Sequence, residues 1–376
     1  MPRSGGVRCA GRQSSGRARL PDGARRLPTD LKPPAVTPWA FAGEMVPMTR
    51  SGALVLLSLV FTLLGSGLPA AAQGTVTLYT SESLDKVNEM KADFEKRHPG
   101  VSLNIYRSGT QVVIGKLQAE IQAGAVQADL LWMADIDFFA QLVRKNLLQA
   151  YTPPEAERVP SKFRYEGGRY HEVRLIFNPV GFNTLRVKER PASWKDLADP
   201  RYKGKVGMAS PFYSGAAFST LGTLVPQAPF GWDFFRRLKD NGVVVEQSNG
   251  TVAQKLASGE FWVASVVDFF LRDMKAKGSP VDHVWPAEGA ILIPTPIGIV
   301  QGSKNTAGAQ AFLRYVHSPD GQRLFVQQGY VPVLPGIEGP KGMPSEKLEI
   351  LPTDEGYIAT HREELKAKYR ELFEAK

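Results

Sequence analysis

Apolar and polar residues follow two alternating patterns from residue 75 onward. Short, mostly apolar runs predict strands over 75–80, 101–107 and 128–133. The stretches between these runs show helical spacing of apolar residues, and they predict helices over 83–97, 110–123 and 137–144. Strands that alternate with helices in this way form βαβ units, which predicts a parallel sheet with right-handed crossovers.

The same alternation returns after residue 183 and predicts a second α/β unit. Its strands are expected over 205–209, 243–246 and 262–267. Its helices are expected over 214–224, 232–239, 251–257 and 270–277. Extended segments should carry the chain between the two units, at 172–177, 180–183, 291–294 and 298–301. Three further helices are expected over 307–316, 321–329 and 360–376.

These elements predict an α/β fold of two lobes, each a mostly parallel sheet flanked by helices. We expect the first lobe to comprise 75–182 plus 290–340 and the second lobe to comprise 183–289. Residues 341–376 should form a C-terminal helical segment that packs on the lobes. The roughly 300 residues beyond position 72 suffice for two domains of ordinary size.

Residues 48–72 carry the pattern of an export signal. A short basic stretch ends at Arg50, an apolar run covers 54–64, and Ala70 and Ala72 form the A-x-A pattern that signal peptidase cleaves. The run is shorter than the roughly 20 residues that a membrane-spanning helix needs, so cleavage near Ala72 is favoured over a retained anchor. Residues 1–47 show no periodicity. We interpret them as a leader from a mis-called start codon, with a disordered basic tail as the alternative.

Removal of the leader and signal changes what the charge indicates. The first 72 residues hold nine of the 46 basic and three of the 37 acidic residues, so the remainder has a net charge of +3 rather than +9. A nucleic-acid-binding surface needs a clustered basic excess, so no nucleic acid is expected as a partner. The single cysteine, Cys9, also lies in the leader, so the exported chain would carry no lipid-anchoring cysteine. These features predict a freely diffusing periplasmic protein.

The motifs of common enzymes do not occur in the sequence. It contains no G-x-S-x-G, no P-loop, no G-x-G-x-x-G after a strand and no H-E-x-x-H. The five histidines occur singly, without the spacing of metal ligands. We therefore expect no catalytic residue, no metal and no cofactor, although a catalytic site assembled in space would leave no such motif.

Hydroxyl and glycine residues recur where the predicted strands end and helices begin. They are Thr80, Ser81, Ser108, Gly109, Thr110, Ser210, Ser214, Gly215, Ser248, Asn249, Gly250 and Thr251. Helix N-termini present free N–H groups and the positive end of the helix dipole, so such junctions can bind anions. N-capping explains any single junction equally well, and Thr251 with Gln254 already fits a capping box. The case for a ligand comes from repetition at four junctions, where strand ends meet.

Two aspartates at similar junctions pose the same choice. Asp268 ends the apolar run 262–267, and Asp135 follows the run 128–133 after one alanine. Each carboxylate could cap the next helix or face a cleft. Capping is favoured for Asp135, and the two roles are evenly balanced for Asp268.

Several stretches together resemble the bacterial family 1 extracellular solute-binding proteins of ABC importers. They are TVTLYTSES, FEKRHPGV, ADLLWMAD, WKDLADPRYKGKVGMASP, IPTPIGIVQGSKN and SPDGQRLFVQQGYVPVLPG, and they lie within 75–340. The resemblance is to the subgroup that binds ferric iron, 2-aminoethylphosphonate or hexose phosphates. It implies a type 2 periplasmic-binding-protein fold, whose lobes close on a ligand like a hinged trap, with crossings near 181–184 and 286–293.

The resemblance also implies a set of cleft residues. That set is Thr80, Ser81, Gly109, Thr110, Ser214, Gly215 and Asp268, and the junction pattern adds Ser108 and Asp135. The hydroxyl and N–H groups would hold an oxyanion, and Asp268 would accept hydrogen bonds from an amine or from sugar hydroxyls. Iron-binding members use adjacent tyrosines where this chain has Phe269 and Phe270, which offer no oxygen to Fe³⁺.

The predicted function is therefore capture of a small polar anionic solute of the phosphonate or sugar-phosphate type. The protein would act as a monomer and deliver the solute to an ABC permease in the inner membrane. Ferric iron held by other oxygen ligands is the alternative within transport. A periplasmic hydrolase on the same fold and a sensory receptor for a membrane kinase are the alternatives of other classes.

Overall fold

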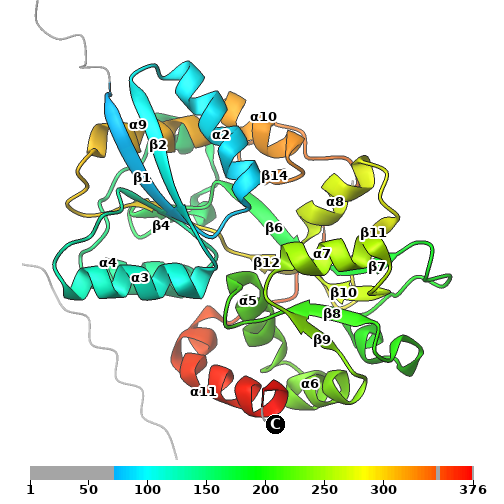
Figure 1. The fold of residues 1–376 in the computed structure, drawn as a ribbon. Coiled ribbons are helices and arrows are strands. Elements are labelled where there is room, and N and C mark those ends of the chain that lie inside the picture. Colours follow the sequence, from blue (N-terminus) through cyan, green and yellow to red (C-terminus); the bar gives the residue numbers. More distant parts are fainter. Residues whose placement is uncertain (1–71, 344–347, 375–376) are drawn as a thin grey trace, which may run out of the picture. The chain divides into compact units, whose positions relative to one another are not determined.

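The computed structural model describes residues 72–343 and 348–374, which Figure 1 shows as a coloured ribbon. The leader and signal predicted over 1–47 and 48–72, and with them Cys9, lie outside the described residues except for Ala72. Three sheets, of six, five and three strands, organise the described part of the chain. Within it, no helix has both the length and the apolar character that crossing a membrane requires.

The six-stranded sheet, which we call the first sheet, has the strand order β2-β1-β3-β13-β5-β4. Its strands are β1 (Gly74–Thr80), β2 (Val101–Arg107), β3 (Leu130–Trp132), β4 (Arg164–Tyr165), β5 (Tyr170–His171) and β13 (Ile297–Ile299). Because side chains alternate along a strand, β1 directs Val76 and Leu78 to one face and Tyr79 to the other. The helices on these faces are α2 (Leu84–Arg97) and α9 (Thr306–His317) on the first, and α3 (Thr110–Gln122) and α4 (Ile136–Arg144) on the second.

The five-stranded second sheet has the order β11-β7-β10-β8-β9. Its strands are β7 (Val180–Asn183), β8 (Val206–Ala209), β9 (Val244–Glu246), β10 (Val263–Ser265) and β11 (Val281–Val284). Alternation along β10 again separates two cores, with Val263 facing one and Ala264 the other. The helices beside this sheet are α5 (Gly215–Leu224), α6 (Gly231–Asp240), α7 (Asn249–Ser258) and α8 (Asp268–Ala276).

A small three-stranded sheet connects the two main sheets. Its order is β12-β6-β14, with bounds β6 (Arg174–Asn178), β12 (Ile291–Ile293) and β14 (Val331–Pro332). β6 continues through Pro179 into β7 of the second sheet, and β12 leads on to β13 of the first sheet. The two crossings therefore lie side by side as an antiparallel pair, in which Ile291 is opposite Asn178.

The α/β architecture predicted from the sequence is confirmed, but both main sheets are mixed rather than mostly parallel. In the described residues the parallel pairs are β1–β2, β1–β3, β8–β9 and β8–β10. β13 and β7 pair antiparallel with β3 and β10. Each of these two strands follows a crossing strand directly, without the helix that a parallel connection needs. β11 was not predicted from the sequence, because Asp282 and His283 interrupt its apolar pattern.

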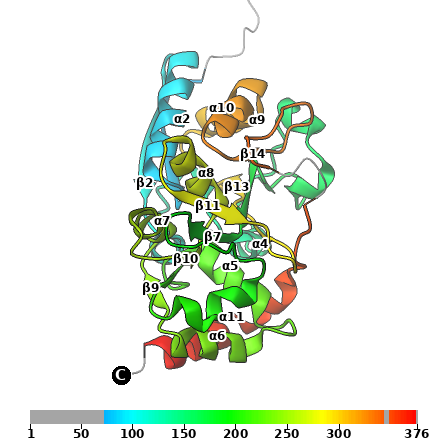
Figure 2. The same ribbon diagram turned by 90° about the vertical axis from the view of Figure 1, so that its right-hand side faces the viewer.

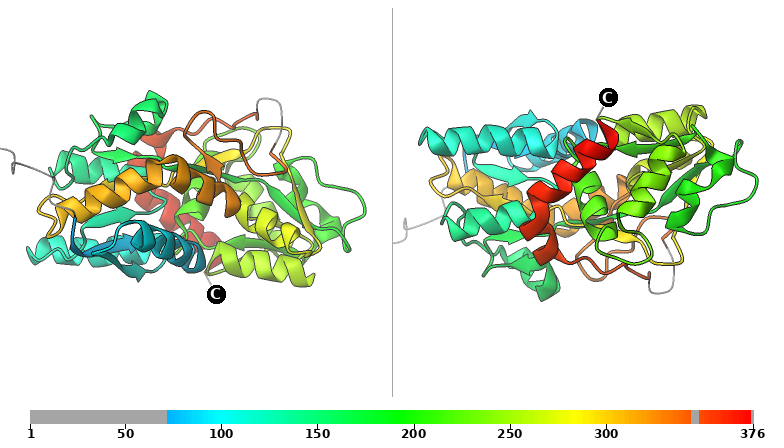
Figure 3. Two further views of the ribbon diagram at one scale, coloured as in Figure 1. Left: turned by 90° about the horizontal axis from the view of Figure 1, so that it is seen from above. Right: turned by 90° about the horizontal axis from the view of Figure 1, so that it is seen from below.

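The C-terminal helices are α10 (Pro319–Gln327) and α11 (Glu355–Phe373). α11 begins earlier than the predicted 360–376, because the Asp354 carboxylate caps it and accepts a hydrogen bond from the Tyr357 N–H at 2.8 Å. In Figure 2, α2, α9 and α10 lie at the top of the view and α6 and α11 at the bottom. Seen from below in Figure 3, α11 runs obliquely between the helices of the two main sheets. Short 3₁₀ helices span Pro154–Arg158, Ser161–Phe163, Trp194–Ala198 and Pro200–Tyr202.

Candidate ligand-binding cleft

A cleft of about 430 Å³ lies between the carboxyl ends of the strands of the two main sheets. Its first wall follows β1, β2 and β3 and consists of Ser81, Glu82, Ser83, Leu84, Asp85, Arg107, Gly109, Thr110 and Ala134. Its second wall belongs to the second sheet and consists of Tyr213, Ser214, Gly215, Ala216, Ser248, Asn249, Gly250, Gln254, Val267, Phe269, Phe270, Asp273 and Met274. Three residues of or near the crossing strands complete the lining: Ile176, Ile293 and Thr295.

The two walls touch each other on both sides of the cleft. On one side, the Gly215 N–H donates to Thr110 Oγ1 at 3.3 Å, and the Arg107 guanidinium donates to the Tyr213 hydroxyl at 3.4 Å. On the other side, Lys86 Nζ of α2 lies 3.3 Å from Asp273 Oδ1 of α8. The structure therefore holds the walls in an approached arrangement, in which a small solute would contact both.

Two glycines allow this close approach. A Cβ atom on Gly215 would lie 1.9 Å from the carbonyl oxygen of Ala134, and one on Gly109 would lie 2.6 Å from the Tyr213 ring. Neither distance is possible for real atoms, so any larger side chain would push the walls apart. Sequence reasoning identified both glycines as cleft residues, and the structure adds the reason why glycine occupies them.

Helices begin differently on the two walls. On the second wall, Ser214 caps α5 by accepting from the Ala217 N–H, and Ser248 caps α7 by accepting from the Thr251 N–H. The capping box predicted at Thr251 is therefore wrong, because α7 starts earlier and Thr251 already lies inside it. On the first wall, the N-cap residue of α3 is Gly109, which has no side chain to cap with. The first N–H groups of α3 thus face the cleft without a capping side chain.

Arg107 is the one basic residue among the described residues that line the cleft. It is the last residue of β2, and its Nε donates to the backbone oxygen of Glu82 at 2.9 Å. This contact fixes the guanidinium in the first wall, whose lining also includes Gly109 and Thr110 at the start of α3. From the sequence, Arg107 was predicted as part of a strand and not as a site residue. The available signal was a basic residue at a strand end, directly before Ser-Gly-Thr.

Acidic residues occupy the other side of the cleft. Asp85 and Asp273 line it where α2 meets α8. Burial opposes the charged form of Asp85, but hydrogen bonds from the Ser83 hydroxyl and the Lys86 N–H lower its pKa below the ordinary value. Asp85 is therefore ionised at neutral pH. The cleft thus offers a cationic guanidinium and uncapped helix N–H groups at one side and two carboxylates at the other, where Asp273 is also paired with Lys86 and Lys277.

Glu82 is a third carboxylate in the lining, and a buried ion pair holds it. Its Oε2 accepts a hydrogen bond from Arg174, a fully buried residue at the start of β6. Burial raises the pKa of Glu82, and the charges of Arg174 and Arg107 counteract that rise. Arg174 also donates to Thr295 Oγ1 at 2.8 Å, so one arginine on a crossing strand fixes two lining residues.

The structure brings five of the nine predicted site residues together in the lining. They are Ser81, Gly109, Thr110, Ser214 and Gly215. Thr80 lies just behind the first wall, fully buried, with its hydroxyl accepting from the Glu82 N–H at 3.1 Å. Ser108 is outside the lining as well, and its N–H donates to the Thr80 carbonyl at 3.2 Å. Both residues shape the loops that carry the lining rather than presenting groups to the cleft.

The two aspartates lie outside the lining, and each is paired with an arginine. Asp135 caps α4 by accepting from the Phe138 N–H at 3.0 Å, and both of its oxygens bind Arg362. Asp268 is completely buried, accepts from the N–H groups of Phe177 and Phe269, and lies 2.5 Å from Arg272 Nη2. An amine or sugar hydroxyl in the cleft cannot reach a carboxylate so enclosed, so Asp268 does not have the solute-facing position expected for it.

No group of three or more His, Cys, Asp or Glu side chains that could hold a metal ion occurs in the described residues. Phe269 and Phe270 line the cleft with apolar rings, which offer no oxygen to a metal ion. Phe269 is buried and packs against Tyr330 with ring centroids 4.4 Å apart. This part of the second wall suits the carbon skeleton of a solute.

Comparisons with known proteins place this cleft in context. The model of a family described as bacterial extracellular solute-binding protein matches residues 127–355. The putative 2-aminoethylphosphonate-binding periplasmic protein of Salmonella typhimurium is 25% identical over 323 residues, which cover 81% of this chain and 88% of that protein. An uncharacterized protein of Haemophilus influenzae is 29% identical over 293 residues, which cover 73% of this chain and 83% of the relative.

Solved structures share the fold. The periplasmic binding protein AfuA from Actinobacillus pleuropneumoniae, with fructose 6-phosphate bound, matches with a TM-score of 0.73 and 24% identity, covering 81% of this chain and 100% of AfuA. Iron-bound HitA from Pseudomonas aeruginosa matches with a TM-score of 0.69 and 19% identity, covering 80% of this chain and 99% of HitA. These likenesses confirm the periplasmic-binding-protein fold predicted from the sequence.

Proposed function

The chain belongs to the bacterial extracellular solute-binding proteins, and from this premise we propose that it captures a small phosphorus-containing zwitterion of the 2-aminoethylphosphonate type. The observation that carries the proposal is the separation of opposite charges along the cleft. Arg107 and the uncapped start of α3 lie on one side, and Asp85 and Asp273 lie on the other. A phosphonate or phosphate group suits the first side and an ammonium group suits the second.

The name of the Salmonella typhimurium relative supports the same ligand class, since that protein is described as a putative 2-aminoethylphosphonate binder. A sugar phosphate would use the first side equally well but would place neutral hydroxyls against the carboxylates. Ferric iron is disfavoured because Phe269 and Phe270, at the positions where the family resemblance implies tyrosine ligands, have no oxygen to offer it. The charged lining therefore supports the zwitterion over the other ligands that this fold is known to hold.

Capture depends on both walls. A solute held between Arg107 and Tyr213 gains contacts on both sides only when the walls approach, so binding shifts the population toward the approached form. That form would then be recognised by an ABC permease in the inner membrane. The signal over 48–72 would bring the chain to the periplasm, where it would work as a monomer. N-terminal sequencing of the exported protein tests this part, with a first residue near Gln73 expected.

Titration calorimetry of the chain without residues 1–72 tests the ligand class. 2-Aminoethylphosphonate should bind with a Kd of about 1 µM or tighter, which corresponds to roughly 8 kcal/mol. Ethylphosphonate, which lacks the amine, should bind at least about 10-fold more weakly if Asp85 and Asp273 recognise an ammonium group. Tight binding of ferric citrate without any response to phosphorus compounds would overturn the proposal.

We also propose that the protein binds its solute without transforming it. Incubation with 2-aminoethylphosphonate and with sugar phosphates should release no inorganic phosphate, as measured by a phosphate assay. Turnover of either compound would instead favour the hydrolase that the sequence left open. A neighbouring gene for a membrane kinase, in place of a permease and an ATPase, would favour a sensory receptor.

A further inference from the structure

The C-terminal helix α11 is attached to the second-sheet side of the molecule. Its Ile358 packs so closely on Gly222 of α5 that a Cβ there would lie 2.6 Å from Ile358 Cγ1. Tyr369, near the other end of the helix, is buried and packs edge-on against Phe212 at 5.9 Å between ring centroids. Ahead of the helix, the hydroxyls of Thr353 and Thr223 are hydrogen-bonded at 2.9 Å. α11 is therefore anchored along its length to α5 and the loop before it.

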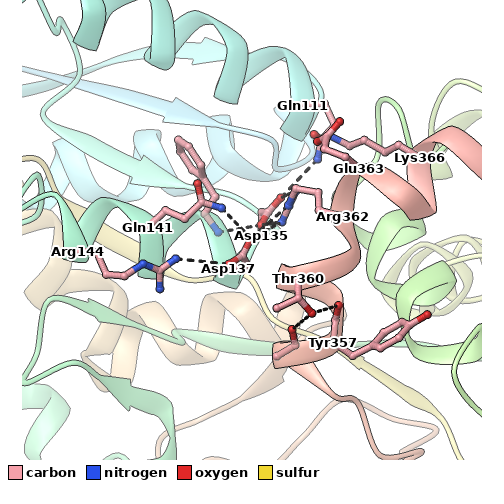
Figure 4. Close-up of polar contacts among 12 residues, drawn as sticks. Gln111, Asp135, Asp137, Gln141, Arg144, Tyr357, Thr360, Arg362, Glu363 and Lys366 are labelled. Carbon is pink, nitrogen blue, oxygen red and sulfur yellow. Dashed lines mark hydrogen bonds and ion pairs between the residues drawn. The ribbon is translucent and has the colours of Figure 1, made fainter.

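One side chain of α11 reaches the first-sheet side instead. Arg362 Nη2 and Nη1 donate to the two oxygens of Asp135 at 2.6 and 2.8 Å, and Nη2 lies 3.1 Å from Asp137 Oδ2. Figure 4 shows this fork, in which the arginine extends from α11 to the start of α4. The side chains of Arg362, Asp135 and Asp137 are 14%, 3% and 6% exposed, so water screens the pair little.

This ion pair lies directly behind the cleft. Asp135 follows Ala134, whose carbonyl oxygen is the first-wall atom closest to Gly215 of the second wall. On its other side, the Arg362 guanidinium lies 4.7 Å from the centre of the Phe218 ring of α5. One guanidinium is thus held between both halves of the molecule, at the point where the walls meet.

We propose that α11 is a strap that stabilises the approached walls, and that Arg362 is a positioning residue that sets solute affinity without touching the solute. Separation of the walls would carry α11 away with α5 and break the fork to Asp135 and Asp137. Two neighbouring carboxylates would then lose their shared cation, which is costly for groups so buried. The strap thus raises the share of approached molecules before any solute arrives, and a bound solute completes the shift. The effect on affinity rests on the proposed function, whereas the effect on the walls does not.

The wall-to-wall distance can be measured directly in the solute-free protein. The chain without residues 1–72 contains no cysteine, so Gln118→Cys on α3 and Lys239→Cys on α6 give a unique pair of spin-label sites, both exposed. Double electron–electron resonance on this pair measures the distribution of distances between the two halves of the molecule. Arg362→Gln should shift the distribution toward longer distances, because the two buried carboxylates lose their shared cation.

Arg370→Gln is the matched control. Arg370 lies on the same helix, but its guanidinium lies over Phe212 on the second-sheet side alone, at 4.8 Å from the ring centre. This variant should leave the distance distribution unchanged. Arg362→Lys, which keeps the charge but loses the two-pronged geometry, should give an intermediate distribution.

The result that overturns the strap is a distribution for Arg362→Gln identical to that of the parent, with only a lower unfolding temperature. Arg362 would then stabilise α11 without coupling the halves. If Arg362→Gln fails to fold, Arg362→Lys decides, and a distribution for Arg362→Lys identical to that of the parent has the same meaning. Calorimetry with 2-aminoethylphosphonate adds the functional arm, in which Arg362→Gln should weaken binding about 10-fold. A parent that fails to bind this compound contradicts the proposed function, while the distance measurements still decide the strap.

Discussion

The two walls of the cleft are built from the same kind of strand-to-helix junction, yet they use their helix starts differently. On the second wall, Ser214 and Ser248 cap α5 and α7, and Asn249 Nδ2 ties the two starts together by donating to Ser214 Oγ at 2.9 Å. On the first wall, α3 begins at a glycine cap, beside the Arg107 guanidinium. The starts of α5 and α7 on the second wall are thus capped, and α8 on that wall begins at Val267 without a capping side chain. The start of α3 on the first wall combines uncapped N–H groups with the cationic Arg107 in the same lining, so it retains donors for an anion.

This difference shows that a hydroxyl at a junction is a poor guide to binding by itself. Serines that cap have already used an oxygen on the protein, and their contribution to a solute is limited to the remaining hydroxyl proton or lone pair. A glycine at the same position leaves the N–H groups free and lets the opposite wall approach. The first wall should therefore dominate recognition of the anion, and the second wall should mainly complete the enclosure.

The largest effect is expected at Arg107. Arg107→Gln removes the one cation in the described lining, so binding of 2-aminoethylphosphonate should weaken about 100-fold, or roughly 2.7 kcal/mol. Calorimetry measures this loss. Arg236→Gln, at an exposed arginine on α6, is the control and should bind like the parent. Equal affinity of Arg107→Gln and the parent would show that the anion does not bind at the first wall.

The next effect concerns wall approach. Gly215→Ala would place a Cβ 1.9 Å from the Ala134 oxygen, so the walls must stay further apart and affinity should fall about 10-fold or more. Gly250→Ala is a matched control, because Gly250 also lines the cleft but a Cβ there meets nothing closer than 3.6 Å. Should both variants bind equally well, contact between the walls would not be needed for capture.

The pH dependence of stability tests the contact between α11 and the first-sheet side, where Glu355 lies near Asp135 and Asp137. Burial, with the charges of Asp135 and Asp137, raises the pKa of Glu355 from 4.5 to about 7. The groups facing Glu355 are Asp135, Asp137, Asp354, Arg362, Tyr165 and Tyr170. A raised carboxyl pKa in the folded state favours folding below pH 4.5, and this contribution disappears as the pH rises through about 7.

Glu355→Gln should therefore stabilise the protein at pH 8, by about 1–2 kcal/mol, and have little effect at pH 5. Thermal unfolding at the two pH values measures the difference between this variant and the parent. Glu363→Gln, on the same helix with a side chain 84% exposed, should show no such pH dependence. A gain that is equal at both pH values would exclude titration of Glu355 as its cause.

The smallest effect is a difference in stability between a capped helix start and an uncapped one. Ser214→Ala removes a cap and should cost about 1 kcal/mol of unfolding free energy in urea denaturation. Ser83→Ala, at the start of α2 on the first wall, should cost only a few tenths of a kcal/mol, because Ser83 makes no capping hydrogen bond to the helix backbone. A similar loss of unfolding free energy for both variants would contradict the difference in helix capping between the two walls.

The sequence predicted most elements because their own periodicity determines them. Apolar spacing in 83–97 predicted α2, whose buried residues include Val87, Met90 and Phe94. The strand pairing was less predictable. β7 and β13 pair antiparallel with β10 and β3, and this direction depends on where the crossing strands lie. The sequence pattern contains no information on that placement.

For the site as well, features set by neighbouring residues could be predicted, and contacts between distant parts of the chain could not. Ser81, Gly109, Thr110, Ser214 and Gly215 could be found because strand ends gather at one edge of a sheet. The pairing of Asp268 had a local signal, since Arg272 follows one helical turn later. The partner of Asp135 had none, because Arg362 lies far away in the chain and reaches it only through the packing of α11 on α5.

The proposed function requires that the two walls clamp a phosphorus-containing solute between them. Small-angle X-ray scattering of the chain without residues 1–72, followed through a titration with 2-aminoethylphosphonate, tests it most directly. We expect a decrease in the radius of gyration that saturates with the calorimetric Kd and that is lost in Gly215→Ala. Scattering curves that stay identical from the solute-free to the saturated protein would contradict it.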